Sequence, residues 1–177
     1  SGSHVAQVVG ARGKLLGGSS SINAMVWIRG HPADYDGWAA QGNPGWGWAD
    51  VLPAFKAIED NQAGANDWRG IGGPLHVSSC EDQVHPLSRH YLKAAQQAGL
   101  PLNPDFNGRN QEGVGIYQIS TKGGRRMSSA RAFLRPAMKR PNVHVETDAY
   151  VTRILFEGKR AIGVEYQQNG HTHRVRA

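Results

Sequence analysis

Four segments of this chain have the apolar spacing or the terminal residues of α-helices: residues 32–38, 51–60, 85–98 and 128–139. Pro32 suits the first turn of the first helix, where proline costs least, and Asp34 and Asp36 favour the positive amino end of that helix. Asp50 can cap the second helix at its amino end. The first third of the chain is therefore predicted to hold two short, consecutive helices.

The third and fourth helices are defined mainly by the residues at their ends. Gly99 can act as the carboxyl cap of the third helix, and Pro101 prevents its continuation. Ser128 is placed to cap the fourth helix, and Pro136 predicts a break or kink within it.

Alternating apolar and polar residues predict strands at residues 75–78, 114–121, 143–147, 150–157, 161–168 and 171–176. Residues 61–74, rich in Gly, Asn and Asp, are predicted to form a loop. The turn 157–159 and the pair Asn169-Gly170, a strong hairpin signal, join the last three strands. The carboxyl-terminal strands therefore predict an antiparallel meander, and the fold class is α+β without internal repeats.

The most informative segment of the chain is the glycine- and serine-rich stretch from Gly13 to Val26, which reads Gly-Lys-Leu-Leu-Gly-Gly-Ser-Ser-Ser-Ile-Asn-Ala-Met-Val. Glycine tolerates positive φ and lacks the Cβ that would keep a ligand away from the backbone. Hydroxyl and amide groups suit an acceptor-rich, anionic or carbonyl-bearing partner. An apolar run from Ile22 to Ile28 follows directly, so the stretch is predicted to be a ligand-binding loop anchored to a core.

Two common glycine motifs do not fit this chain. A phosphate-binding P-loop requires Gly five residues before its Gly-Lys pair and Ser or Thr after the Lys, where this chain has Val8 and Leu15. The dinucleotide fingerprint Gly-x-Gly-x-x-Gly is approached only at residues 113–118, which lack the third glycine and open no obvious helix.

The glycine loop instead resembles the first signature of the glucose-methanol-choline (GMC) family of FAD-dependent oxidoreductases. Gly30 and Asp36 complete the spacing of this signature. The resemblance continues through further segments, at residues 29–38, 43–48, 73–75, 125–131, 140–143 and 154–164. It covers the chain from about residue 12 to the end, and within the family it is strongest to bacterial choline dehydrogenases and related alcohol dehydrogenases.

The resemblance implies a set of cofactor-binding residues and no catalytic residue in this chain. In the family the glycine loop approaches the pyrophosphate and ribityl groups of FAD, the following segment contacts the isoalloxazine ring, and a backbone valine contacts the adenine. The corresponding residues are Gly13, Lys14, Gly17, Gly18, Ser19, Asn23, Ala24, Met25, Val26 and Val151. Ile22 stands where some family members have a flavin-linking His, so FAD is expected to be held non-covalently.

The resemblance also implies that this chain is an internal fragment of a longer flavoprotein. Family members open with the nucleotide fingerprint and close with a segment bearing the catalytic His, and neither is present here. The expected organisation is a vector-derived scar or leader (1–11), the flavin-attachment loop with following helices (12–73), a segment of an antiparallel-sheet substrate domain (74–142) and FAD-domain strands (143–177).

The implied function is that of an FAD-dependent alcohol, choline-like, dehydrogenase or oxidase. It would transfer a hydride from a CH–OH group to flavin N5, and the fragment alone is expected to be inactive. The alternative is a non-catalytic, isolated ligand-binding or interaction domain; the two differ in whether the missing halves exist in the full gene. The specific alcohol, the electron acceptor and the oligomeric state are left open.

Composition excludes several other classes of protein. The net charge of +6 comes from scattered basic residues without a nucleic-acid-binding signature, so no nucleic-acid partner is expected. The eight His residues lack ligand spacing, and Cys80 is the single cysteine, so neither a metal site nor an internal disulfide is expected. No apolar run reaches the ~20 residues of a membrane helix. The expected location is the cytoplasm or the periphery of the inner membrane.

Overall fold

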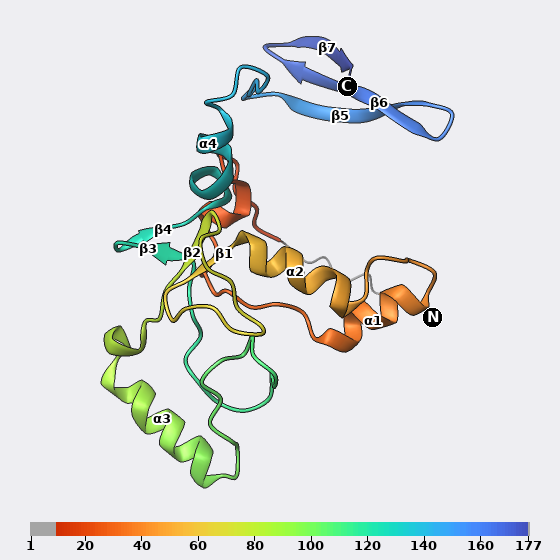
Figure 1. Ribbon diagram of the computed structural model, residues 1–177. Helices are drawn as coiled ribbons and strands as arrows, with labels where there is room; N and C mark the ends of the chain where they lie inside the picture. The colour runs from red at the N-terminus through yellow and green to blue at the C-terminus, as the bar shows by residue number, and fades with distance from the viewer. Residues whose placement is uncertain (1–9, 177) are drawn as a thin grey trace, which may run out of the picture. The chain divides into compact units, whose positions relative to one another are not determined.

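The computed structural model describes residues 10–176, and the chain divides into two units at Pro136/Ala137 (Figure 1). Residues 1–9 and 177 lie outside the described residues, and so does most of the predicted scar or leader over residues 1–11. The helices lie in the first unit, apart from the last residue of the last helix, Ala137, and the second unit contains a three-stranded sheet, so the α+β class is confirmed for the described residues. None of the described helices is long and apolar enough to cross a membrane.

Two helices follow the glycine loop, as predicted, but the second begins earlier than expected. Helix α1 spans Pro32–Ala40 and α2 spans Trp48–Ile58. Asp50 is not the cap of α2: it lies in the first turn and accepts a hydrogen bond from the Gly47 N–H at 3.2 Å. Asp36 Oδ1 accepts from the Trp48 N–H at 2.8 Å, so this residue of α1 caps the neighbouring helix. This cap comes from a residue in another helix, so the residues around the start of α2 could not identify it.

An aromatic cluster packs α1 against α2. The ring of Tyr35 lies 5.3 Å from Trp38, 5.5 Å from Trp48 and 5.9 Å from Phe55, measured between centroids. Trp46 meets Trp38 edge-on at 5.9 Å. Such offset and edge-to-face pairs add to the stabilisation from area burial alone, so these tryptophans have a packing role.

The predicted second helix stops short because residues 59–61 form a strand instead. Strand β1 (Glu59–Asn61) pairs in parallel with β2 (Leu75–Val77), so the prediction of helix through residue 60 was wrong. The loop predicted for residues 61–74 is confirmed from residue 62 onward. Burial alternates along both strands, and Glu59 and Asn61 face inward. Two polar residues are buried here because long-range partners satisfy them, which local sequence cannot reveal.

The third helix is confirmed, and the strand predicted after it is not. Helix α3 spans Pro86–Gln97, following a 3₁₀ turn at Glu81–Gln83, and Gly99 adopts φ +92° beyond its end. Residues 114–120 form only isolated bridges, to Leu102, Val26 and Ser78. Their backbone bonds to a different neighbour at each step, so no continuous ladder forms. A short hairpin of β3 (Thr121–Lys122) and β4 (Arg125–Arg126) follows.

The predicted fourth helix is short and irregular. A π-helical turn spans Ala130–Leu134 and continues as α4 over Arg135–Ala137. Pro136 lies inside α4, so the helix does not break there; it ends at Ala137, two residues before the predicted end at Lys139. This region contributes to the main apolar core of the first unit, which consists of buried side chains with Trp27 packed against them: Leu75, Val77, Met127 and Ala132. The core therefore lies directly beneath the segment that follows the glycine loop.

The second unit is the predicted meander with one strand fewer. Strands β5 (Tyr150–Glu157), β6 (Arg160–Gln168) and β7 (His171–Arg176) are antiparallel in the order β5-β6-β7. Asn169 and Gly170 have φ of 51° and 79°, as a two-residue hairpin turn of this type requires. Residues 143–147 are not a strand; the Thr147 carbonyl accepts from the Gln168 side chain at 2.8 Å rather than from a neighbouring strand.

Candidate functional site

The glycine loop folds into a tight turn that depends on two of its glycines. Gly17 adopts φ +92° and leads into the 3₁₀ turn Gly18–Ser21. A Cβ on Gly13 would lie 2.3 Å from the carbonyl oxygen of Gly18, and a Cβ on Gly17 would lie 2.4 Å from Ser21 Oγ. Any side chain at either position would force the backbone or its neighbours to move. These two glycines therefore close the loop on itself.

One side of this loop is open. A Cβ on Gly18 would meet nothing within 4 Å, and Ser19, Asn23 and Ala24 are exposed. Within residues 10–176, the backbone N–H groups of Gly17 and Ala24 have no hydrogen-bond acceptor. The loop thus offers free donors beside an unobstructed backbone, which suits a ligand that carries oxygen acceptors.

Met25 has a left-handed backbone conformation that is rare for a residue with a side chain. Its φ is 65°, a region that costs L-residues other than glycine about 1–2 kcal/mol. Asn23 Oδ1 accepts from the Met25 N–H at 3.0 Å, while the Met25 carbonyl accepts from the Ser120 N–H at 2.9 Å and from Ser120 Oγ at 3.2 Å. Hydrogen bonds on both sides therefore hold this strained residue in place. Val26 then bridges to Ile119.

The loop is anchored by residues more than 100 positions away. The Ser129 N–H donates to Ser20 Oγ at 2.9 Å, and Ser129 Oγ donates to the Gly17 carbonyl at 3.1 Å. Arg126 Nη1 reaches the Asn23 carbonyl and Asn23 Oδ1, both at 2.7 Å. Sequence reasoning used the segment 125–131 only to identify the family and missed its direct role at the loop. Its density of Arg and Ser next to a helix start was the available signal.

The loop itself carries large apolar side chains that are exposed within the described structure. Leu15 is 53% exposed, Leu16 49%, Ile22 52% and Val26 41%. Four such residues beside free backbone donors fit a ligand that combines a flat apolar part with polar edges, as FAD does. The chemistry of this loop is therefore compatible with the flavin expected from the sequence.

The predicted cofactor-binding residues fall into two groups. The structure brings together the nine that lie between Gly13 and Val26, with the Lys14 side chain exposed on the same loop. Val151 lies on β5 in the second unit, where it is 53% exposed.

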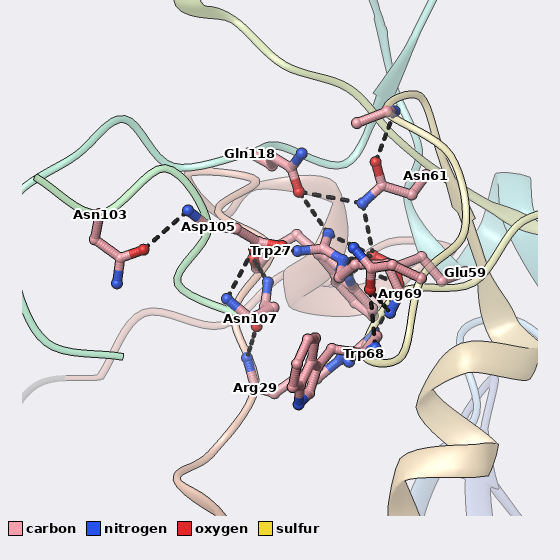
Figure 2. Close-up of polar contacts among 12 residues, drawn as sticks. Trp27, Arg29, Glu59, Asn61, Trp68, Arg69, Asn103, Asp105, Asn107 and Gln118 are labelled. Carbon is pink, nitrogen blue, oxygen red and sulfur yellow. Dashed lines mark hydrogen bonds and ion pairs between the residues drawn. The ribbon is translucent and has the colours of Figure 1, made fainter. Parts of the chain in front are cut away.

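The buried carboxylate of Glu59 binds side chains of Trp27 and Arg29, which directly follow the loop in the chain (Figure 2). Glu59 has no exposed surface, and its Oε1 accepts from Trp27 Nε1 at 2.9 Å and from Arg69 Nη2 at 2.6 Å. Its Oε2 accepts from Arg29 Nη2 at 2.6 Å and from the Gly70 N–H at 3.1 Å. Both carboxylate oxygens are thus fully hydrogen-bonded, as burial of a charge requires.

The network is balanced in charge. Arg69 Nη1 also pairs with Asp105 Oδ1 at 2.5 Å, and its Nη2 donates to Gln118 Oε1 at 2.5 Å. Two guanidinium groups therefore meet two carboxylates. Burial lowers the pKa of Arg29, partly offset by the charge of Glu59, and Arg29 Nε has no partner within the described residues. Sequence reasoning missed this cluster entirely.

Asn107 adds two hydrogen bonds to the backbone of residues 27–29. Its Oδ1 accepts from the Arg29 N–H at 2.7 Å, and its Nδ2 donates to the Trp27 carbonyl at 2.8 Å. The buried side chain of Asn107 therefore takes the place of a neighbouring strand for this segment, as Figure 2 shows. Because Trp27 and Arg29 come directly after the loop, the whole network fixes the point from which the loop emerges.

Comparison with known proteins assigns this arrangement to a family. The family model described as GMC oxidoreductase matches residues 2–177. This chain belongs to the GMC oxidoreductase family. The glycine loop and the network beneath it are thus features of a GMC oxidoreductase chain, and the family resemblance inferred from the sequence is confirmed.

Individual relatives agree with this assignment. The chain is 48% identical over 166 residues to the mitochondrial choline dehydrogenase of Homo sapiens, covering 94% of this chain and 28% of that protein. It is 49% identical over 162 residues to an alcohol dehydrogenase [acceptor] of Pseudomonas putida, covering 90% and 29%. Pyridoxine 4-oxidase from Mesorbium loti has a similar structure, with a TM-score of 0.85 and 36% identity, over 93% of this chain and 33% of that one. The chain spans less than a third of the length of the two curated relatives.

Proposed function

We propose that this chain is the part of a longer FAD-dependent oxidoreductase that holds the flavin, and that the whole protein oxidises a CH–OH group. The observation that carries the proposal is the anchored glycine loop, in which the Gly17 and Ala24 N–H groups have no acceptor among residues 10–176 and lie on the same loop as exposed apolar side chains. When bound, FAD supplies the hydride acceptor, at its N5 atom, for the carbinol carbon of the substrate.

The residues that would hold the cofactor are those of the loop. Gly17, Gly18 and Ser19 would approach the pyrophosphate and ribityl groups, since the backbone is open at Gly18. The segment from Asn23 to Val26 would orient the isoalloxazine ring. We further propose that Gly13 and Lys14 belong to the same site, and that Val151 on β5 contacts the adenine.

The remaining segments would have separate roles in this enzyme. Residues 12–73 would carry the flavin-attachment loop and its helices, and residues 74–142 would wall the substrate side. Residues 143–177 would return to the FAD domain. All residues of β5, β6 and β7 keep some exposed surface, which supports a sheet that packs against further parts of a larger protein.

The substrate class that we propose is an alcohol, choline among the candidates. The names of the human and Pseudomonas putida relatives support this choice. The catalytic base would lie outside this sequence. The full-length protein is therefore expected to reduce a dye acceptor with choline or another alcohol, whereas residues 1–177 alone with added FAD should not. Turnover by the isolated chain would contradict this division of roles, and failure of the full-length protein with every alcohol would contradict the proposed reaction.

We also propose that FAD is bound without a covalent link to this loop. Ile22, at the position of the flavin-linking His in some family members, has no nucleophilic atom. Acid denaturation of the flavin-loaded protein should therefore release all flavin into the supernatant. Yellow colour that stays with the precipitated protein would refute the proposal, and Ile22→His provides a comparison in which a linkage could form.

A further inference from the structure

Arg126 is the one charged side chain, among the described residues, that hydrogen-bonds to the segment 13–26 from outside it. A single atom, Nη1, makes all of its contacts: to the Asn23 carbonyl and Asn23 Oδ1, both at 2.7 Å, and to the Ser20 carbonyl at 3.3 Å. The neighbouring Arg125 lies on the same two-residue strand, β4. Its side chain is exposed and has no hydrogen-bond or ion-pair partner between residues 10 and 176.

The contact with Asn23 passes directly to the strained residue of the loop. Asn23 Oδ1 accepts from Arg126 Nη1 and also from the Met25 N–H at 3.0 Å. Two donors at one end fix which end of the carboxamide is the oxygen. Arg126 thus holds Asn23 in the orientation that stabilises the left-handed Met25, and it leaves the amide NH₂ of Asn23 for a ligand.

The hairpin that carries Arg126 is bonded to the same loop at a second point. Ser120 donates to the Met25 carbonyl from both its N–H and its Oγ, and the Ser120 carbonyl accepts from the Met127 N–H at 2.9 Å. Residues 120 and 127 thus close the base of the hairpin while Ser120 holds the loop. The position of Arg126 relative to Asn23 is therefore set by backbone hydrogen bonds rather than by a free side chain.

We infer that Arg126 is a positioning residue for flavin: it fixes Asn23 and Met25 in the conformation that receives the cofactor. The inference rests on the proposed function, because it takes FAD to be the ligand of the loop. It goes further in assigning the control of loop geometry to one guanidinium nitrogen in the β3–β4 hairpin. Hydrogen bonds to charged groups are stronger than those between neutral groups, so loss of the Arg126 contacts is expected to lower the affinity for FAD.

The test compares Arg126→Gln with Arg125→Gln in the full-length, flavin-loaded protein. Each variant loses one positive charge from β4, but only the first loses contacts with the loop. After removal of the flavin, titration with FAD should give a Kd raised at least about tenfold for R126Q and unchanged for R125Q. The visible circular dichroism of bound flavin should also change in R126Q alone, because it reports the environment of the ring.

Arg126→Lys sharpens the test. Because one nitrogen makes all three contacts, the lysine ammonium, with three donors on a single nitrogen, should restore most of the affinity and the wild-type spectrum. A lysine variant as weak as R126Q would overturn the single-nitrogen account. If R126Q does not fold, Asn23→Ala on the exposed loop replaces it, with the same expected rise in Kd.

The outcomes separate this inference from the proposed function. Wild-type protein that binds no FAD would contradict the proposed function itself. Wild-type protein that binds FAD, together with R126Q, or N23A in its place, that matches R125Q in Kd and spectrum, would overturn the role of Arg126 and leave the proposed function standing.

Discussion

Two glutamates of this chain each bind two arginines, and they do so in different environments. Glu59 in the first unit is fully buried between Arg29 and Arg69. Glu165 on β6 pairs with Arg153 at 2.8 Å and with Arg174 at 2.9 Å, but those arginine side chains are 57% and 64% exposed. The Glu165 side chain itself is 14% exposed, so the two clusters differ chiefly in their arginines, which are buried around Glu59 and largely exposed to water around Glu165.

The difference shows where a substitution should destabilise the first unit most. A buried ion pair gains little over an apolar replacement, yet removal of one partner leaves an uncompensated charge in the interior. A surface pair is screened by water and salt, so its removal changes little. Because Trp27 and Arg29 bind Glu59 just after the glycine loop, the buried cluster links stability to the geometry of the cofactor site.

The largest loss of stability is expected for Glu59→Gln. The amide keeps the size of the side chain but leaves Arg29 and Arg69 with Asp105 as the only carboxylate in the cluster. The free energy of unfolding should fall by about 3–5 kcal/mol, measured by urea denaturation. Glu165→Gln is the matched control and should scarcely move the urea midpoint. Equal effects of the two changes would contradict the contrast between them.

A smaller loss of stability is expected for Trp27→Phe. This change removes the indole donor to Glu59 Oε1 while keeping an aromatic ring against the core. A hydrogen bond to a charged group contributes about 1.5–3 kcal/mol, so the urea midpoint should drop by less than in the Glu59 variant. Trp46→Phe is the control, because Trp46 is 54% exposed and its ring forms an edge-to-face pair with Trp38. A Trp27 variant as stable as this control would show that the indole hydrogen bond is dispensable.

The smallest effect concerns the titration of Glu165. Hydrogen bonds from Arg153 first, and then from Arg174, hold the pKa of Glu165 below its ordinary value. This favours the folded sheet above the ordinary glutamate pKa, and the contribution is lost as pH falls through the lowered, folded-state pKa. Arg153→Gln should raise the pKa of Glu165 towards the ordinary value, as measured by NMR titration. The shift should shrink at high salt, and a salt-independent shift would mark the pair as more buried than it is in the structure.

Local signals in the sequence predicted the elements that depend on local interactions. The Asn169-Gly170 turn, the proline at the start of α1 and the glycine after α3 each act within a few residues, and each is confirmed. The glycine loop was found in the same way, because its conformation requires particular small residues. Its use as a cofactor site stays a proposal.

Features that depend on distant partners were missed. Strand β1 was assigned to a helix end and a loop because a buried glutamate and asparagine look like surface residues until their distant partners are known. Those partners are Arg29 and Arg69 for Glu59, and Gln118 for Asn61. Residues 114–121 alternate like a strand, yet they bond successively to three different neighbours. Arg126 and Ser129 lie more than 100 residues from the loop that they hold, so no local pattern could pair them with it.

The most direct test of the account is the visible absorption spectrum of the full-length protein, purified without added cofactor and repeated on the supernatant after acid precipitation. The native sample should show the two absorption bands of oxidised flavin, and the supernatant should contain all of that flavin after precipitation. A protein that shows neither band, and that does not acquire them when refolded with FAD, would contradict the claim that the glycine loop holds a flavin.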